Sequence, residues 1–91
     1  MSRDVAAALD LKILYFGRLS EQLNCRAEHL ALPAAVTTTG QLRELLITRG
    51  GKWSALDDAR IRVAVNQEIA RMADTVNPGD EIAFFPAVTG G

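Results

Sequence analysis

The sequence predicts an α+β roll in which one main helix packs across a mixed sheet. Three observations support this fold class: an apolar strand pattern at residues 11–17, one clearly capped helix near residues 38–51, and alternating strand patterns from residue 60 onward. Strands on both sides of a single helix are typical of a two-layer α+β domain. The 91 residues, 48% of them apolar, suffice for one domain with one modest core.

The first strand is expected at "LKILYFG", residues 11–17. Its residues alternate between two faces, with Leu11, Ile13 and Tyr15 on one face and Lys12, Leu14 and Phe16 on the other. Both faces carry large apolar side chains. The following "GRLSEQLNC" can hold a turn or a short helical piece, and "AEHLALP" predicts a second strand that Pro33 ends.

The main helix is predicted by its start, its spacing and its end. Thr38 and Gln41 fit a capping box, in which each side chain satisfies an unpaired backbone donor at the helix start. Gly50 and Gly51 supply a left-handed stop. Between them the helical spacing is carried by Leu42, Leu45, Leu46 and Arg49.

The last third of the chain predicts a hairpin and a final strand. "KWSAL" predicts a loose turn with Trp53 in contact with the core, and "RIRVAVNQEIA" predicts a hairpin whose turn uses Asn66 at positive φ. "NPGD", residues 77–80, predicts a tight turn. The final strand "EIAFFP" leaves the sheet at Pro86. We therefore expect a flexible extension at residues 1–9, a folded domain at residues 10–86 and a flexible tail at residues 87–91.

Charge and composition argue against several classes of function. Lys and Arg total 10 and Asp and Glu total 11, with no long run of either sign, which argues against a surface for nucleic acid or anionic membrane. No apolar stretch approaches the roughly 18 residues of a spanning helix, and the start lacks a signal-peptide pattern, so we expect a cytoplasmic protein. A single cysteine, Cys25, and a single histidine, His29, predict neither a disulfide nor a metal site, and no bound cofactor is expected.

The side chains predict little catalysis. Cys25 and His29 are not expected to meet as a nucleophile and base, and the adjacent carboxylates at residues 57–58 and 80–81 are expected to be solvated turn residues. No phosphate-binding glycine motif is present. The chain nevertheless ends in Gly90 and Gly91, although glycine makes up only 7 of 91 residues.

The terminal diglycine can be a frayed end or a reactive group. A free α-carboxyl has a pKa of ~3.3–3.7, so it is ionised at pH 7 and could attack the α-phosphate of ATP held by another protein. Glycine has no Cβ, so an extended tail could enter a narrow channel with its carbonyl accessible. Gly91 is therefore the predicted reacting residue.

Four motifs together resemble the family of molybdopterin synthase small subunits. The members of this family are sulfur carriers with a β-grasp, ubiquitin-like fold. The four motifs are the capped helix, "LKILYFGRLSEQL", "RVAVNQE" and "NPGDEIAFFPAVTGG", and the resemblance covers about residues 11–91. The long C-terminal motif is highly specific, whereas a terminal diglycine alone is shared with thiamin-pathway carriers and ubiquitin-like modifiers. The departures are the N-terminal extension and Ala87, where the family often has a second proline.

The resemblance implies a function for the terminus. An E1-like enzyme would use ATP to adenylate Gly91, and a sulfur-donor system would convert it to a thiocarboxylate. The tail, Pro86, Ala87, Val88, Thr89 and Gly90, would then enter the active site of the large synthase subunit and deliver sulfur to cyclic pyranopterin monophosphate. The large subunit would supply the catalytic residues in a heterotetramer. Alternatives are a sulfur carrier for thiamin or tRNA thiolation, a ubiquitin-like modifier, and an interaction module with an inert tail.

A partner-binding face is expected as well. Leu14, Phe16 and Phe85 lie on strand faces that point away from the helix, and Ile69 follows the hairpin turn. If these strands are neighbours, as in a β-grasp sheet, they expose an apolar patch, and such patches usually mark interfaces. The alternative is that a loop around Trp53 covers the patch.

Overall fold

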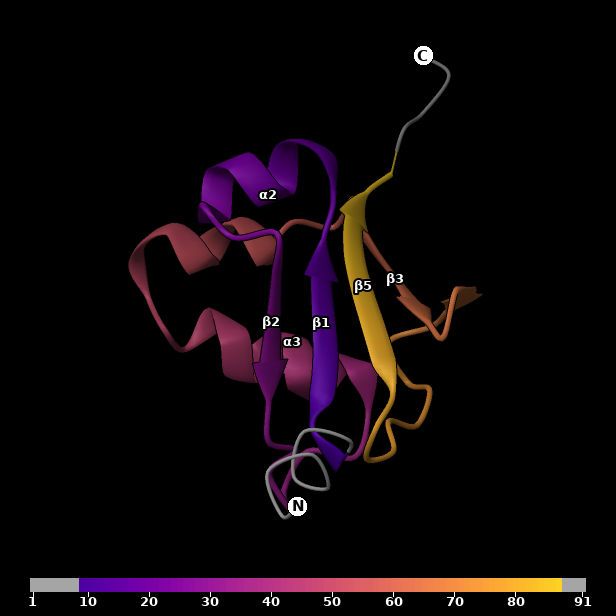
Figure 1. Ribbon diagram of the computed structural model, residues 1–91. Coiled ribbons are helices and arrows are strands. Elements are labelled where there is room, and N and C mark those ends of the chain that lie inside the picture. The colour runs from indigo at the N-terminus through magenta and orange to yellow at the C-terminus, as the bar shows by residue number, and fades with distance from the viewer. Residues whose placement is uncertain (1–8, 88–91) are drawn as a thin grey trace.

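The computed structural model of the chain describes residues 9–87 (Figure 1). The predicted extension at residues 1–9 and tail at residues 87–91 therefore lie almost wholly outside the described residues, and their boundaries stay predictions. The elements follow one another as β1 (Leu11–Tyr15), α2 (Gly17–Leu23), β2 (Ala27–Leu30), α3 (Thr39–Ile47), the 3₁₀ helix η1 (Gly51–Leu56), β3 (Ile61–Val65), β4 (Glu68–Ala70) and β5 (Glu81–Pro86).

The five strands form one mixed sheet in the order β2-β1-β5-β3-β4. The first and last strands of the chain, β1 and β5, lie side by side in the centre and run parallel, while every other pair is antiparallel. In Figure 1 the sheet lies in front of α3, so the helix covers one face and leaves the other open. The predicted mixed sheet with one main helix across it is confirmed.

The helix α3 forms where its capping box begins. The Gln41 backbone N–H donates to the Thr38 hydroxyl at 3.1 Å, and the Thr38 backbone N–H donates to the Gln41 side chain at 3.1 Å. Gly50 and Gly51 follow the helix with φ of 80° and 56°, a region that glycine occupies without a Cβ clash. The predicted start of this helix is confirmed. The helix ends earlier than predicted, at Ile47 with Thr48 as a right-handed C-cap, so Arg49 lies after the helix and the two glycines redirect the chain toward the next element.

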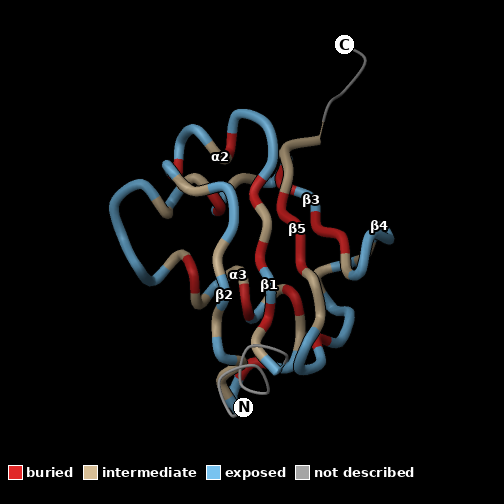
Figure 2. The backbone as a smooth tube through the Cα atoms, in the orientation of Figure 1, coloured by how far each residue is buried: buried red, intermediate tan, exposed pale blue. Residues whose placement is uncertain are grey.

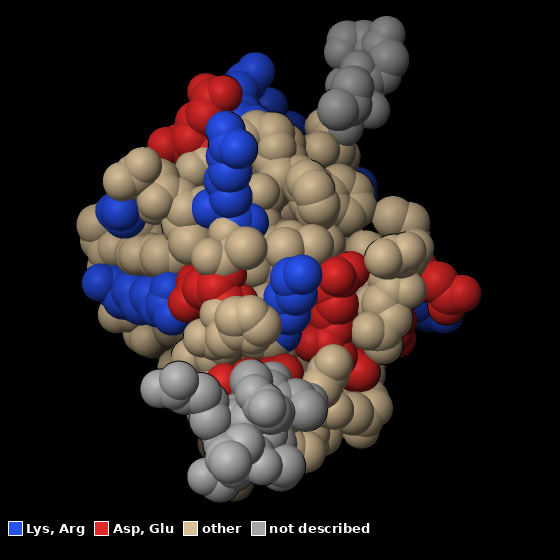
Figure 3. Space-filling view, viewed as in Figure 1, with Lys and Arg blue, Asp and Glu red and all other residues tan. Residues whose placement is uncertain are grey.

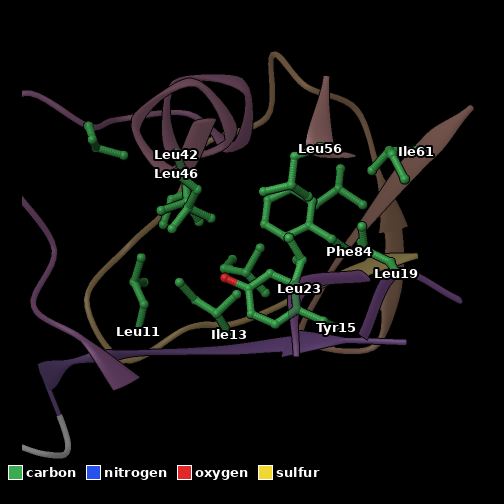
Figure 4. Close-up of a cluster of buried hydrophobic side chains, with 14 residues drawn as sticks. Leu11, Ile13, Tyr15, Leu19, Leu23, Leu42, Leu46, Leu56, Ile61 and Phe84 are labelled. Atoms are coloured by element: carbon green, nitrogen blue, oxygen red, sulfur yellow. The ribbon is translucent and has the colours of Figure 1, made fainter. Parts of the chain in front are cut away.

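The core lies between the sheet and the helices. Side chains of alternate β1 residues, Leu11, Ile13 and Tyr15, face Leu42 and Leu46 of α3, and all five are at most 2% exposed (Figure 4). Figure 2 shows that buried residues follow the central strands, whereas β4 is exposed. Burial of this kind contributes roughly 25 cal/mol per Å² of apolar surface and is the main stabilising effect.

Three segments differ from or sharpen the sequence prediction. Residues 17–23 form a helix because Leu19 and Leu23, one turn apart, both reach the core. The predicted loose turn at "KWSAL" is a 3₁₀ helix, which buries Leu56. The second strand stops at Leu30, three residues before Pro33, because it pairs only with the four residues at positions 11–14.

Trp53 has the contact with the core that the sequence predicts. Its ring meets the Tyr15 ring edge-on with centroids 5.6 Å apart, and the Arg49 guanidinium lies 4.4 Å from the Trp53 centroid. Trp53 therefore lies on the helix side of the sheet. Within residues 9–87, no helix has both the length and the apolar character needed to cross a bilayer.

Candidate functional site

The root of the C-terminal tail is held by the sheet. Phe84 is fully buried and anchors β5 in the core, and Pro86 is paired with Ile61 of β3. Beyond the strand, the Ala87 backbone N–H donates to the Arg60 carbonyl at 2.8 Å. The sheet thus fixes the chain direction up to the last described residue. The predicted residues Val88, Thr89, Gly90 and Gly91 lie outside the described residues, so their roles stay predictions.

A hollow of about 530 Å³ lies beside the tail root. Its walls include Arg18 from α2, Ser54 from η1, Arg60 before β3, and Pro86 with Ala87. Arg60 is paired there with Asp58, whose carboxylate accepts from the guanidinium at 3.0 Å and 3.2 Å. This ion pair lowers the pKa of Asp58 through hydrogen bonds from Arg60.

The open face of the sheet carries the predicted partner-binding residues. In the sheet register Leu14 lies opposite Ala83, and Arg62 lies opposite Phe85. The Phe16 backbone N–H donates to the Phe84 carbonyl at 3.1 Å, which brings Phe16 next to the end of β5. Alternation then puts Leu14 and Phe85 on the same side, away from α3.

The exposure of these residues is high for large apolar side chains. Phe16 is 50% exposed and Ile69 is 74% exposed, whereas Leu14 and Phe85 are half-buried. Figure 3, which looks at the open face, shows a largely uncharged surface over the ends of β1 and β5 with charged side chains around it. Because Trp53 packs against Tyr15 on the opposite face, it does not cover this surface.

Two small residues on the open face were not singled out from the sequence. Ala64 of β3 and Ala83 of β5 are paired in the register and are 8% and 9% exposed. They form a flat strip between Leu14 and Ile69, since Ala83 pairs with Leu14 and Ala64 pairs with Ile69. The same alternation that predicts Phe85 on this face predicts them too, but small side chains do not stand out in a sequence.

The family of the chain is decided by comparison with known proteins. Residues 13–91 match the ThiS family. The chain belongs to the ThiS family. Two curated relatives of this ThiS-family chain are named molybdopterin synthase sulfur carrier subunit. The protein from Haemophilus influenzae is 39% identical, and the one from Escherichia coli is 35% identical, each over 82 residues that cover 89% of this chain and 99% of the relative.

Solved structures show the same fold. SAMP1 from Haloferax volcanii matches with a TM-score of 0.72 and 25% identity, covering 90% of this chain and 99% of that chain. The subunit 1 and 2 complex of the molybdopterin-converting factor from Helicobacter pylori matches with a TM-score of 0.60 and 19% identity, over 90% and 99% of the two chains. The predicted β-grasp, ubiquitin-like fold of this ThiS-family chain is confirmed.

The strongest electrostatic cluster lies on the covered face, far from the open one. The Tyr15 hydroxyl donates to Glu28 at 2.8 Å, and the Arg49 guanidinium donates to both Glu28 oxygens at 2.9 Å. The Arg49 hydrogen bonds lower the pKa of Glu28. Burial, followed by the Glu28 hydrogen bond, raises the pKa of the Tyr15 hydroxyl. The cluster ties β1 and β2 to the segment that follows α3 in this ThiS-family domain.

The remaining polar candidates are not assembled into a reactive group. The Cys25 thiol is half-buried and donates to the Ala27 carbonyl at 3.6 Å, and His29 is exposed on edge strand β2 opposite Lys12. Within residues 9–87, no three His, Cys, Asp or Glu side chains are grouped closely enough to hold a metal ion. Among residues 9–87, Cys25 and His29 therefore stay apart as predicted, and the role of the terminus stays a prediction.

Proposed function

We propose that the chain is the sulfur carrier subunit of a molybdopterin synthase. The observation that carries the proposal is the similarity, at 35–39% identity over 82 residues, to two proteins with that name. The chain covers 99% of each relative, so the similarity extends over the whole carrier and not a shared piece of it. The terminal glycines and the apolar open face both fit this role.

The reacting group is the terminal carboxylate of Gly91. It attacks the α-phosphate of ATP in an E1-like activating enzyme, and pyrophosphate leaves to give an acyl-adenylate. A sulfur nucleophile from a donor system then attacks the acyl carbon and displaces AMP, which leaves a thiocarboxylate. The chain binds no cofactor of its own in this scheme, and because activation consumes ATP, we place it in the cytoplasm.

The proposed binding partner is the large synthase subunit. Leu14, Phe16, Ile69 and Phe85 on the open face bind it, and the tail from Pro86 to Gly91 enters its active site. There the thiocarboxylate sulfur displaces an oxygen substituent of cyclic pyranopterin monophosphate. Water then hydrolyses the resulting thioester, which leaves the sulfur on the pterin and returns the Gly91 carboxylate. Removing the apolar side chains from water supports association, because such patches on small proteins usually mark interfaces.

The test is thiocarboxylation followed by sulfur transfer. Purified chain is incubated with the activating enzyme, ATP and a sulfur source, and intact-protein mass spectrometry detects replacement of one terminal oxygen by sulfur. The product is then mixed with the large subunit and cyclic pyranopterin monophosphate, and molybdopterin is assayed. Thiocarboxylate without any molybdopterin would contradict the assignment to this pathway and favour a carrier for thiamin or tRNA thiolation.

Two variants sharpen this test. Deleting Gly91, or replacing it with valine, should leave the melting temperature unchanged and abolish thiocarboxylation, because the residue lies beyond the core strand β5. Cys25→Ser is the matched control: it removes the only thiol and should still give full thiocarboxylation. Thiocarboxylate on Gly91→Val, or its loss in a folded Cys25→Ser protein, would place the sulfur elsewhere.

A ubiquitin-like modifier is the second candidate, and the similarity to the archaeal protein SAMP1 favours it. That structure, also described as small archaeal modifier protein 1, shares 23–25% identity with this chain. The same mass spectrometry separates the two functions, since a modifier gives a chain joined to lysine side chains of other proteins. A carrier gives only the chain with a changed terminus.

A further inference from the structure

A second hollow lies at the β4 edge of the sheet, where β4 ends and the chain turns toward α3. Its volume is about 450 Å³. The floor is apolar, with Ile61 and Val63 from β3 and Met72 after β4. Ile69, the most exposed apolar side chain of the open face, also lines it. The hollow is therefore continuous with the proposed docking face.

Three arginines from three different segments line this hollow: Arg43 of α3, Arg62 of β3 and Arg71 after β4. The one acidic residue that lines it, Asp58, is already paired with Arg60. Arg43 is itself paired with Glu44 and Asp57, each at 3.4 Å. Within residues 9–87, neither Arg62 nor Arg71 forms an ion pair, so these two carry the free positive charge of the hollow. Because the whole chain has a net charge of −1, this positive site is a local feature.

Arg43 and Arg71 are held in place. The Arg43 Nε–H donates to the Leu56 carbonyl at 2.7 Å, and its side chain is only 18% exposed. The Arg71 carbonyl accepts from the buried Thr39 hydroxyl at 2.7 Å, and its N–H donates to Asp74 at 2.9 Å. These bonds fix the Arg43 side chain and the Arg71 backbone, while the Arg71 side chain stays exposed and can reach a ligand.

Gly40 permits this arrangement by letting α3 approach the segment after β4. The Gly40 backbone N–H donates to the Met72 carbonyl at 2.8 Å, and a Cβ on Gly40 would lie 2.9 Å from that oxygen. Any larger residue would push the two segments apart. The helix start thus fixes Arg71 and Met72 beside Arg43.

We propose that this arginine-rimmed hollow binds an acidic segment of the large subunit, with carboxylates on the unpaired Arg62 and Arg71 side chains and an apolar side chain on the floor. The proposal rests on the proposed function, because the large subunit is the partner on the adjoining face. Arginine binds carboxylates through two parallel hydrogen bonds, so the two arginines without an ion pair, Arg62 and Arg71, favour an acidic segment. The contact extends the docking surface from Ile69 around the sheet edge.

Charge reversal tests the proposal. The affinity of Arg71→Glu and of Arg62→Glu for the large subunit is measured by titration calorimetry at low and high salt. We expect Kd to rise at least about tenfold for each variant, as for close charge pairs across interfaces, and the salt dependence of binding to fall. Lys52→Glu is the matched control: it makes the same charge change on exposed η1 and should bind like the wild type.

Several outcomes separate this proposal from the proposed function. If the wild-type chain binds the large subunit and transfers sulfur while both charge reversals bind equally well, the hollow is not a contact and only this inference is wrong. If the wild-type chain does not bind the large subunit, the proposed function fails as well. Restored affinity when an acidic residue of the large subunit is changed to arginine would identify the paired residue and support the inference.

A small anion is the competing occupant. Inorganic phosphate is titrated into isotope-labelled chain and followed by nuclear magnetic resonance. Saturable shifts at Arg62 and Arg71 at about 1 mM phosphate or below would identify a small-anion site and overturn the protein contact. Weak, non-saturating shifts are the expected result.

Discussion

Among single residues, the adjacent phenylalanines of β5 lie on opposite faces of the sheet, so we expect one to affect stability and the other to affect partner binding. Phe84 points to the helix side and is fully buried against the stacked Tyr15 ring, with centroids 6.3 Å apart. Phe85 points to the open face and is half-buried beside exposed Phe16. One step along the strand therefore changes the expected effect of a substitution from folding to docking.

Phe85→Asp should weaken docking much more than it weakens the fold. An unpaired charge desolvated at an apolar interface costs at least ~1–3 kcal/mol, or about one to two decades in Kd for the large subunit. The melting temperature should change little, because a partly exposed side chain contributes little to the core. Calorimetric titration and thermal unfolding measure the two effects.

Phe84→Ala is the matched control for that variant. Loss of a fully buried phenylalanine costs about 3–5 kcal/mol, so the control should unfold at a much lower temperature. A collapsed fold in Phe85→Asp would mean that the strand faces are reversed. Unchanged affinity in that variant would mean that the open face is not the interface.

Among the elements, the turn of the β3–β4 hairpin is tied to the start of β5 by the side chain of Asn66, in addition to the β3–β5 strand pairing. Asn66, at φ 52°, donates from its side-chain amide to Asp80 at 3.0 Å and accepts from the Glu81 backbone N–H at 3.0 Å. Asp80 in turn accepts from the Asn77 backbone N–H at 2.8 Å. Asp80 is thus part of this network and not the purely solvated turn residue that the sequence predicted. The network fixes the hairpin that carries Ile69.

Asn66→Ala should therefore reduce both stability and docking. Loss of these hydrogen bonds costs about 1–3 kcal/mol of unfolding free energy, because Asp80 and Glu81 lose partners. The effect on Kd for the large subunit should disappear when Ile69→Ala is already present, since Asn66 acts through Ile69. Asn66→Gly, which tolerates the positive φ, isolates the side-chain contribution. Fully additive effects on Kd would contradict the coupling.

Glu28 joins β2 to Arg49 in the segment after α3, and its contribution to stability should depend on pH. Its pKa is lowered in the fold, mainly by the Arg49 hydrogen bonds, so the stabilisation is full above the ordinary glutamate pKa of about 4.3 and is lost as pH falls through the lower folded value. Glu28→Gln should lower stability by about 1–3 kcal/mol at pH 7. The stability of the variant should converge with that of the wild type only once the pH has fallen below the lowered folded pKa of Glu28.

Denaturant unfolding of the two proteins across this pH range measures the difference. Asp58→Asn is the control, because Asp58 and Arg60 form an exposed pair that should change stability less. A constant difference between wild type and Glu28→Gln from pH 7 to pH 3 would show that the ionised Glu28 side chain is not the stabilising species.

Local signals explain which elements the sequence predicts. The Thr38 and Gln41 capping box and the positive φ of Asn66 are properties of a few adjacent residues, so the sequence predicts both. The 3₁₀ helix at residues 51–56 escapes prediction because burial of Leu56 by distant residues, and not local propensity, favours it. The arginine-rimmed hollow cannot be predicted from the sequence for a similar reason, because Arg43 and Arg71 lie far apart in the chain and only the fold brings them together.

At the scale of the whole molecule, the buried core and the proposed docking surface lie on opposite faces of one sheet. The helix side holds the fully buried core, including Leu46, and the open side holds Phe85 and Ile69. The chain that carries the terminus leaves from β5, the strand that pairs with both β1 and β3. The carrier can therefore present its tail from a rigid point while a partner covers the open face.

This separation predicts that core and face variants have additive effects. Leu46→Ala should cost about 2–5 kcal/mol of unfolding free energy, because it leaves a cavity, and should not change Kd for the large subunit while the protein stays folded. Phe85→Asp should weaken binding to the large subunit and change the unfolding free energy little. In the double variant, the changes in unfolding and binding free energy should each equal the sum of the single-variant changes within about 0.5 kcal/mol, because the two side chains lie on opposite faces of the sheet. Chemical denaturation and calorimetric titration of the four proteins, all well below their melting temperatures, complete the cycle. A coupling above about 1 kcal/mol in either measurement would mean that the sheet transmits changes from the core to the docking face, and that binding of the partner and stability of the carrier are linked.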